Sequence, residues 1–180
     1  MKKIILSVFL ILSLSLIFYY VNNLKNTEII TCPISIKIVT VNGLSMSPFL
    51  NSGQEVIALY NYYDCNEVLR NDVVLYKYSG NSNLLIKFVK AIPGDKWSLE
   101  KTDSGYKIII NDVFLVNSES SPYLIPEGSI KMLELYAEDY PIIPADTYLL
   151  LGDKTDGSLD STSFGLVGKK DIIAKVRIAD

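Results

Sequence analysis

The most constraining feature of this chain is an uncharged, apolar run near its N-terminus. Lys2 and Lys3 are followed by residues 4–21, in which three serines are the only polar interruptions. As a helix, this run would be about 27 Å long, close to the thickness of the hydrocarbon core of a bilayer. We therefore expect residues 4–21 to form a transmembrane anchor, with residues 1–3 in the cytoplasm.

The end of the apolar run bears on whether it is removed. A cleavable secretory signal has an apolar stretch of about 7 to 15 residues that ends in a small-x-small site. Here the run ends in Phe18, Tyr19 and Tyr20, which are typical of the membrane interface. A cleaved signal and a buried core helix are the alternatives to an uncleaved anchor. Because positive residues stay on the cytoplasmic side, Lys2 and Lys3 predict that the rest of the chain lies outside the cytoplasm.

The composition excludes several classes of protein. The chain has 180 residues, of which 49% are apolar, and this fits a packed domain and excludes disorder. It contains no histidine, which excludes Ser-His-Asp and Cys-His catalysis and every histidine-containing metal site. Beyond residue 21, 15 basic and 20 acidic residues leave a net charge of −5, so we expect no nucleic-acid partner. We also expect no cofactor.

The chain has two cysteines, Cys32 and Cys65, and both lie in the part expected outside the cytoplasm. A disulfide persists in such a compartment. The sequence leaves open whether the two residues form a disulfide or remain two separate buried thiols, because it does not give the distance between them.

Most of the remaining chain has the alternating pattern of β-strands. Beginning at Ile34, apolar and polar residues alternate with a period of two. We expect an all-β fold, mostly antiparallel, with strands over residues 34–39, 55–60, 72–78, 84–92, 97–101, 106–110, 113–116, 147–151 and 172–176. Tight turns are expected at residues 103–105 and 111–112.

The same pattern predicts the domain organisation. Residues 117–144 are rich in Ser, Glu and Pro and are interpreted as an irregular cap without a long amphipathic helix. Residues 22–33 are expected to be a linker, residues 34–96 and 145–180 a β core, and residues 97–144 an inserted β-meander with its cap.

Without histidine, a serine can still be activated by a lysine that burial keeps neutral. Lys87 lies in a strand-like stretch, where alternation places Leu85, Val89 and Ala91 on the same face. An edge-strand lysine with its amine in water is the alternative. On this stretch alone, Lys90 is an equal candidate.

The candidate nucleophiles lie where the first strand ends. Ser45 and Ser47 follow Gly43 and precede Pro48 in a turn that could leave a hydroxyl and a backbone N–H free for an oxyanion. A structural turn serine is the alternative. A third cluster, residues 151–161, is rich in hydroxyls and carboxylates, but its spacing does not match a calcium-binding EF-hand loop.

Four motifs in order resemble those of the bacterial type I signal peptidases, membrane-anchored serine proteases with a Ser-Lys dyad. Residues 45–50 (SMSPFL) resemble the nucleophile motif, and residues 71–74 (NDVV) resemble the next strand start. Residues 87–95 (KFVKAIPGD) resemble the base motif, whose lysine stands six residues before Pro-Gly-Asp and so matches Lys87. The last motif is matched by Gly152, Asp153, Ser158, Asp160, Ser161 and Gly165.

The resemblance implies a role for each matched residue. Ser45 would be the nucleophile and its N–H half of the oxyanion hole, Lys87 would be the general base, Ser158 would orient the lysine amine, and Asp160 would brace the loop. The residues implied to line shallow substrate pockets are Met46, Leu50, Leu85 and Ile86. An extended substrate would pair beside residues 84–86.

The chain also departs from the family pattern. Gly43 lacks the hydroxyl with which some members complete the oxyanion hole, and Thr162 replaces the arginine that pairs with Asp160. Phe49 replaces Thr and Phe88 replaces a basic residue. Asn71 replaces Gly, a mild change because Asn tolerates a positive φ.

The resemblance implies an endopeptidase that cleaves signal peptides from exported preproteins after a small-x-small site. It would act at the bacterial plasma membrane, with the lipid bilayer as its second partner. A peptidase specialised for pilus or conjugation proteins is one alternative. A non-catalytic, anchored β-domain that binds surface proteins is the other.

Overall fold

The structure is a computed structural model and describes residues 15–16, 32–78, 84–155 and 157–178. The chain divides into two compact units, Met1–Thr31 and Cys32–Asp180. In the first unit, only Ser15 and Leu16 are described, and both are helical. No described helix is long and apolar enough to cross a membrane. The rest of the predicted anchor lies outside the described residues.

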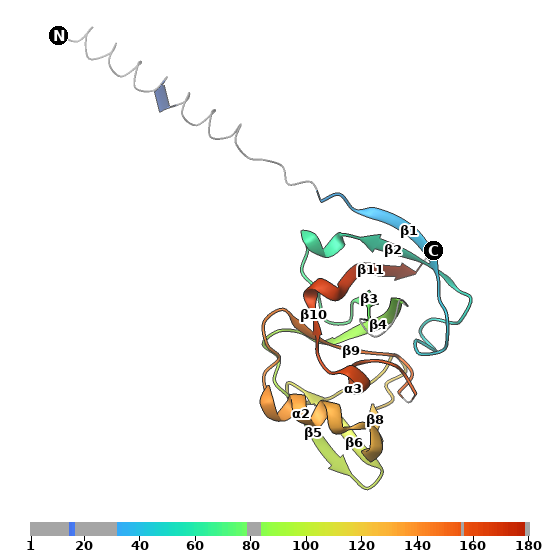
Figure 1. Cartoon of the computed structure of the whole chain (residues 1–180), viewed down its shortest axis with the longest axis vertical. Helices are drawn as coiled ribbons and strands as arrows, with labels where there is room; N and C mark the ends of the chain where they lie inside the picture. The colour runs from blue at the N-terminus through green and yellow to red at the C-terminus, as the bar shows by residue number, and fades with distance from the viewer. Residues whose placement is uncertain (1–14, 17–31, 79–83, 156, 179–180) are drawn as a thin grey trace, which may run out of the picture. The chain divides into compact units, whose positions relative to one another are not determined.

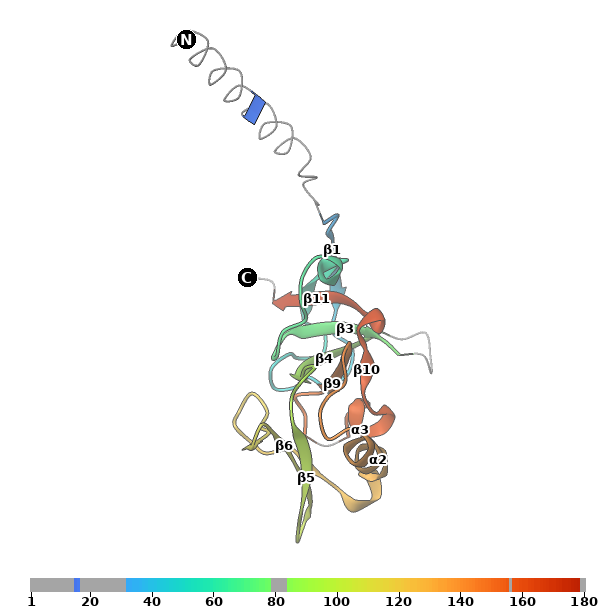
Figure 2. The ribbon, with the colours of Figure 1, turned by 90° about the vertical axis from the view of Figure 1, so that its left-hand side faces the viewer.

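The second unit is built mainly on a seven-stranded antiparallel sheet with the order β1-β2-β11-β3-β4-β9-β10 (Figures 1 and 2). The prediction of a mostly antiparallel β fold is therefore confirmed. Its strands are β1 (Ser35–Thr40), β2 (Glu55–Tyr60), β3 (Val73–Lys77), β4 (Leu84–Ala91), β9 (Thr147–Leu151), β10 (Val167–Gly168) and β11 (Ile172–Ile178).

A second, four-stranded sheet lies between β4 and β9 in the sequence. It contains β5 (Trp97–Thr102), β6 (Gly105–Ile110), β7 (Val113–Phe114) and β8 (Leu124–Ile125), with β7 and β8 both paired to β6. The two predicted turns are confirmed, because they connect β5 to β6 and β6 to β7. Both views place this sheet at the end of the unit opposite β1 (Figures 1 and 2).

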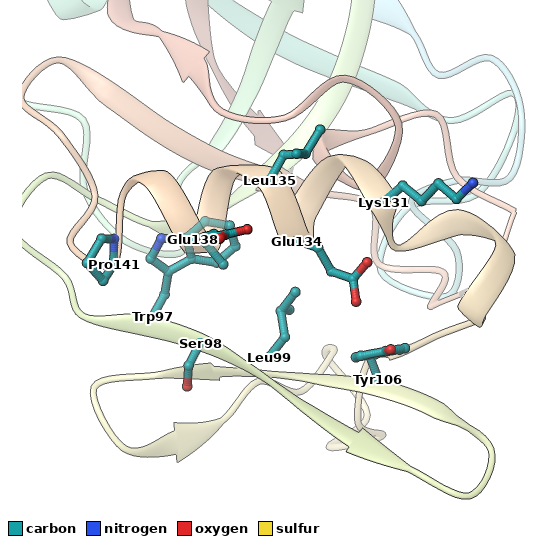
Figure 3. A pocket seen from close by; sticks show the side chains of 10 residues that line it. Trp97, Ser98, Leu99, Tyr106, Lys131, Glu134, Leu135, Glu138 and Pro141 are labelled. Atoms are coloured by element: carbon teal, nitrogen blue, oxygen red, sulfur yellow. The ribbon is translucent and has the colours of Figure 1, made fainter.

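The described part of the unit also contains short helices. They are α2 (Lys131–Asp139), α3 (Ser161–Phe164) and the 3-10 turns η1 (Tyr62–Asp64), η2 (Glu127–Ser129) and η3 (Lys169–Asp171). The interpretation of residues 117–144 as irregular was wrong for α2. Pro126 and Pro141 flank this helix without interrupting it, and its buried Leu133 packs in the cluster that includes Trp97. Figure 3 shows the Trp97 side chain beside α2.

Three clusters of buried side chains hold the unit together. One packs α2 and the second sheet against β9, through residues such as Trp97, Ile108 and Leu149. Another includes Met46 and Leu50 from the turn after β1 and packs this turn against β2, β3, β4 and β11. The third lies around β3, β9 and β11. The turn that contains Ser45 is therefore fixed by the main core.

A disulfide fixes the start of the described unit. Cys32, just before β1, is bonded to Cys65, just after η1, with 5.9 Å between their Cα atoms. The question that the sequence left open is thus answered in favour of the bridge. β1 buries little side-chain surface, and the disulfide adds a covalent attachment to its pairing with β2.

Candidate active site

Ser45 and Lys87 are brought together by two separate elements. Ser45 lies in the turn after β1, and Lys87 lies in the middle of β4. The Lys87 Nζ donates to the Ser45 Oγ over 2.8 Å and to the carbonyl of Ile86 over 2.9 Å. Lys87 is 1% exposed. The alternative of an edge-strand lysine with its amine in water is therefore wrong.

Burial changes the acidity of Lys87. Loss of hydration disfavours the ammonium form and lowers the pKa of Lys87 to about 8, and the negative charge of Asp160 opposes this shift. A lysine with this pKa is partly neutral near physiological pH, and its neutral amine can accept a proton from a hydroxyl. The hydroxyl within its reach is that of Ser45.

The last motif holds the turn of Ser45 in place. The carbonyl of Ser45 accepts a hydrogen bond from the Lys154 N–H over 3.1 Å, and the Phe49 N–H donates to Asp153 Oδ2 over 3.2 Å. No described residue accepts a hydrogen bond from the Ser45 N–H, so this donor remains available for a ligand.

Gly152 explains why the last motif begins with glycine. A Cβ at this position would lie 2.4 Å from the Ser45 carbonyl oxygen and 2.4 Å from the Ser158 Oγ. Such a contact is much shorter than the separation of atoms in packed interiors. Only glycine lets the loop approach the turn of Ser45 this closely.

Ser158 lies beside this contact but differs from expectation in its hydrogen bonding. Its Oγ is buried and has no partner among the described residues, so the expected bond to the Lys87 amine is not formed. The Ser158 Oγ and the Ser45 carbonyl oxygen would each lie 2.4 Å from a Cβ at Gly152, so Ser158 is still close to Ser45.

Asp160 is held by a set of hydrogen bonds within the loop of the last motif. Its Oδ2 accepts from the Gly152 N–H over 2.9 Å, and its Oδ1 accepts from the Thr162 N–H over 3.0 Å and the Thr162 Oγ1 over 2.8 Å. Asp160 also caps the N-terminus of α3. The Thr162 hydroxyl thus donates to the Asp160 carboxylate, at the position where the resemblance implied an arginine.

A groove of about 450 Å³ opens beside Ser45 and Lys87. It lies between two stretches of chain, residues 39–42 and residues 84–87, and it is also lined by Met46 and Leu75. Three of the expected pocket residues, Met46, Leu85 and Ile86, line this groove. Leu50 is fully buried in the core and does not line it.

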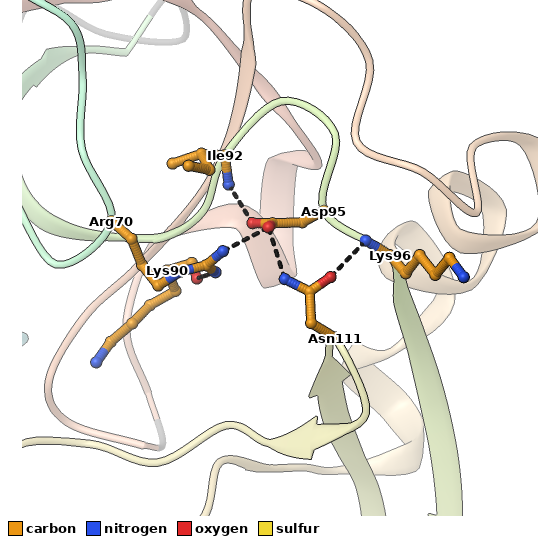
Figure 4. A network of polar contacts seen from close by, with 6 residues as sticks. All are labelled: Arg70, Lys90, Ile92, Asp95, Lys96 and Asn111. Atoms are coloured by element: carbon orange, nitrogen blue, oxygen red, sulfur yellow. Dashed lines mark hydrogen bonds and ion pairs between the residues drawn. The ribbon is translucent and has the colours of Figure 1, made fainter.

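A polar network fixes the turn that follows β4 (Figure 4). The Asp95 carboxylate accepts from the Ile92 N–H over 2.7 Å and from Asn111 Nδ2 over 2.8 Å, and it pairs with Arg70. Burial alone would raise the pKa of Asp95, but these hydrogen bonds outweigh it and hold the pKa below its usual value. Asp95 of the Pro-Gly-Asp motif therefore connects the end of β4 to Asn111 of the second sheet. This role was not predicted from the amino-acid sequence.

Lys90 is the second buried lysine of β4, and its surroundings differ from those of Lys87. It lies where the pairing with β9 shifts register, between Val89 and Ala91. Its Nζ donates to the Val116 carbonyl over 3.1 Å and lies 4.6 Å from the centre of the Phe88 ring. That ring packs in turn against Phe49, at 4.7 Å between centres. Phe49, Phe88 and Lys90 thus form one packed group behind the turn of Ser45.

The structure also bears on the expectations for Ser47, Asn71, Gly43 and metal binding. Ser47 lies in the same turn as Ser45 but makes no hydrogen bond to a lysine in the described part of the chain. Asn71 has a φ of +65°, as expected for a residue that replaces glycine. Gly43 has a φ of +87°, so a side chain there would be strained. The described ranges contain no cluster of three metal-ligating residues.

Comparisons with known proteins place this chain in a family. The family described as "Signal peptidase, peptidase S26" matches residues 5–179. Signal peptidase IB of Staphylococcus aureus (strain Mu50 / ATCC 700699) is 30% identical over 151 residues, which cover 76% of this chain and 73% of that protein. Signal peptidase I of Bacillus caldolyticus is 29% identical over 146 residues, which cover 76% of this chain and 74% of that protein.

A solved structure is also similar. A crystal structure of a signal peptidase I from Enterococcus faecalis V583 has a TM-score of 0.46 and 19% identity, and it covers 62% of this chain and 98% of that chain. The family match spans nearly the whole sequence, and the S. aureus relative matches three quarters of it. The chain therefore belongs to the bacterial type I signal peptidases, the serine endopeptidases of the peptidase S26 family.

Proposed function

We propose that this chain is a membrane-anchored signal peptidase in which Ser45 and Lys87 form the catalytic dyad. The observation that carries the proposal is the 2.8 Å hydrogen bond between the Lys87 amine and the Ser45 hydroxyl, at a lysine that is almost completely buried. Burial supplies the neutral amine that a general base needs, and the hydrogen bond supplies the path for the proton.

The proposed reaction begins with an extended substrate in the groove beside residues 84–86. Ser45 Oγ attacks the scissile carbonyl while the Lys87 amine takes its proton. The Ser45 N–H, which has no partner among the described residues, donates to the developing oxyanion. Lys87 then passes the proton to the leaving amine, the new N-terminus of the mature protein. Water releases the signal peptide from Ser45 in a second step with the same base.

Supporting roles are proposed for the last motif. Asp160 fixes the loop through the Gly152 N–H, and the loop in turn positions Ser45 through its carbonyl. Ser158 Oγ is buried against this loop and has no partner in the described part of the chain, and we propose that a small rotation brings it to the Lys87 amine when the substrate binds. Met46, Leu85 and Ile86 would select small side chains before the cut, and Leu50 would act only by supporting Met46 from the core.

The membrane setting is part of the proposal. Residues 4–21 would cross the plasma membrane once, with residues 1–3 in the cytoplasm and the catalytic unit on the outer side. The substrates would be exported preproteins, whose signal peptides lie in the same bilayer. The disulfide between Cys32 and Cys65 is consistent with an oxidising location outside the cytoplasm.

The test is cleavage of a preprotein with an Ala-x-Ala site by the detergent-solubilised protein. The parent should cut after the second alanine, and Ser45→Ala and Lys87→Ala should not. A parent that fails to cut this preprotein while its fold is intact would contradict the proposed substrate and leave the specialised or non-catalytic alternatives.

A further inference from the structure

The loop that connects β7 to β8, residues 115–123, contacts the last motif at two successive residues. Tyr123, which is 1% exposed, donates its hydroxyl to the Gly152 carbonyl over 2.6 Å. Ser118 donates to the Asp153 carboxylate, from its N–H to Oδ1 over 2.8 Å and from its hydroxyl to Oδ2 over 2.6 Å. These donors belong to the inserted region and lie outside the four family motifs.

Asp153 connects this loop to the turn of Ser45. The residue is fully buried, and its Oδ2 accepts a hydrogen bond from the Phe49 N–H over 3.2 Å as well as from the Ser118 hydroxyl. A buried carboxylate depends on such donors, because it has lost its hydration. The side chain of Ser118 therefore helps to fix the same oxygen that holds Phe49.

The loop holds Ser118 in place from the preceding residues. Asn117 Nδ2 donates to the Asp153 carbonyl over 3.2 Å, and Asn117 Oδ1 accepts from two N–H groups of the same loop. The Val116 carbonyl accepts from the buried Lys90 amine over 3.1 Å. Ser118 thus directs its hydroxyl to Asp153 from a fixed backbone, although the residue itself is exposed.

We propose that Ser118 is a positioning residue for the reaction, which fixes the Asp153 carboxylate and, through the Phe49 N–H, the turn that carries Ser45. The inference rests on the proposed function, in which Ser45 must face the Lys87 amine at 2.8 Å. A displacement of about 1 Å between reacting groups can lower a rate about a hundredfold. Ser118 does not line the groove beside Ser45, so we expect it to affect kcat rather than KM.

The test removes the Ser118 hydroxyl and leaves its N–H in place. Ser118→Ala should lower kcat for a preprotein about tenfold and keep KM within about twofold of the parent, at a temperature where thermal unfolding shows both proteins to be folded. Ser118→Thr retains the hydroxyl and should keep kcat within about twofold. Ser121→Ala is the matched control, because Ser121 is an exposed serine of the same loop whose hydroxyl makes no hydrogen bond to a described residue.

A double-mutant cycle shows whether Ser118 acts through Asp153. Asp153→Asn replaces one acceptor oxygen with an amide group that only donates, so it should lower kcat by itself. In this background Ser118→Ala should have little further effect. Equal fold losses from Ser118→Ala in both backgrounds would overturn the inference. If Asp153→Asn does not fold, the kcat values of Ser118→Ala and Ser118→Thr still decide the question.

The outcomes also separate this inference from the proposed function. If cleavage requires Ser45 and Lys87 while Ser118→Ala keeps the kcat of the parent, the inference is overturned and the dyad stands. A raised KM with unchanged kcat would overturn it too, because Ser118 would then act on substrate binding. Equal losses in Ser118→Ala and Ser118→Thr would show that the hydroxyl is not responsible. Cleavage by Ser45→Ala would instead contradict the proposed function.

Discussion

The Lys87 amine lies 2.8 Å from the Ser45 hydroxyl, whereas Lys90, three residues later on the same strand, directs its amine to the Val116 carbonyl at 3.1 Å. Both side chains are buried, and burial lowers the pKa of each. Burial and acidity therefore do not distinguish the two lysines. Their partners do, since only Lys87 reaches a hydroxyl.

This difference predicts opposite outcomes for the same substitution. Lys87→Met removes the proposed base without changing the volume much, and we expect kcat to fall by at least about a thousandfold. Lys90→Met should keep kcat within about tenfold of the parent, and it should reduce stability by about 1–2 kcal/mol through the lost bond to Val116 and the contact with Phe88. Single-turnover cleavage and thermal unfolding measure the two effects. Loss of cleavage in Lys90→Met alone would reverse the assignment.

The pKa of Lys87, about 8, predicts the pH dependence of cleavage. The neutral amine is the active form, so its fraction falls about tenfold for each pH unit below this pKa and is nearly constant above it. We expect kcat/KM to rise from pH 6 to about pH 8 and then to level off. Lys90→Met should have the same midpoint, because Lys90 does not take part in proton transfer. A rate that is flat from pH 6 to pH 9 would contradict a lysine base.

Thr162 is expected to carry part of the function that the family assigns to an arginine. Thr162→Val keeps the shape of the side chain and removes the hydroxyl that donates to Asp160 over 2.8 Å. We expect a loss of about 1–2 kcal/mol in stability and a reduced kcat, because Asp160 positions the loop through Gly152. Thr162→Ser, which retains the hydroxyl, is the control and should preserve kcat. Equal kcat values for the valine and serine variants would show that this bond has no role.

The sequence predicted the strands well because their pattern is local. β2 and β9 have the predicted bounds, since apolar and β-branched residues fill each strand and turn residues flank it. α2 was missed because it has few apolar positions. The prolines on either side of it were taken to exclude a helix, although the stretch between Pro126 and Pro141 is long enough for one. Its stability comes from packing against Trp97, which lies more than 30 residues away in the sequence.

The site was predicted less completely, mainly because its contacts join segments that are far apart in the sequence. The stretch around Lys87 did not separate it from Lys90, because the second sheet and a register shift bury Lys90 as well. Only the resemblance to the family selected Lys87. The hydrogen bond between Asp95 and Asn111 depends on which segments meet in space. The hydroxyl of Thr162 donates to Asp160 only two residues away, which is a local contact at the N-terminus of α3. Contacts between segments that are distant in the sequence leave no periodic pattern of residues from which they could be predicted.

The disulfide gives a prediction about stability. Cys32 and Cys65 are separated by 33 residues, and a bridge that closes a loop of this length contributes about 3–4 kcal/mol by restricting the unfolded chain. The double variant Cys32→Ser with Cys65→Ser should lose this amount in thermal unfolding, and reductant should have no further effect on it. Reductant should lower the unfolding temperature of the parent to a similar extent. A parent that is insensitive to reductant under unfolding conditions would contradict this contribution.

Gly165 links the last motif to α2 and predicts a coupled pair of substitutions. Its φ is +80°, and a Cβ there would lie 2.1 Å from the Tyr136 ring. Gly165→Ala should therefore cost about 2–4 kcal/mol from backbone strain and overlap together. In a Tyr136→Ala background the overlap disappears and only the strain remains, so the cost of Gly165→Ala should be clearly smaller. Thermal unfolding of the four proteins gives the coupling. An equal cost in both backgrounds would mean that the backbone alone requires glycine, and that α2 does not constrain the loop through Tyr136.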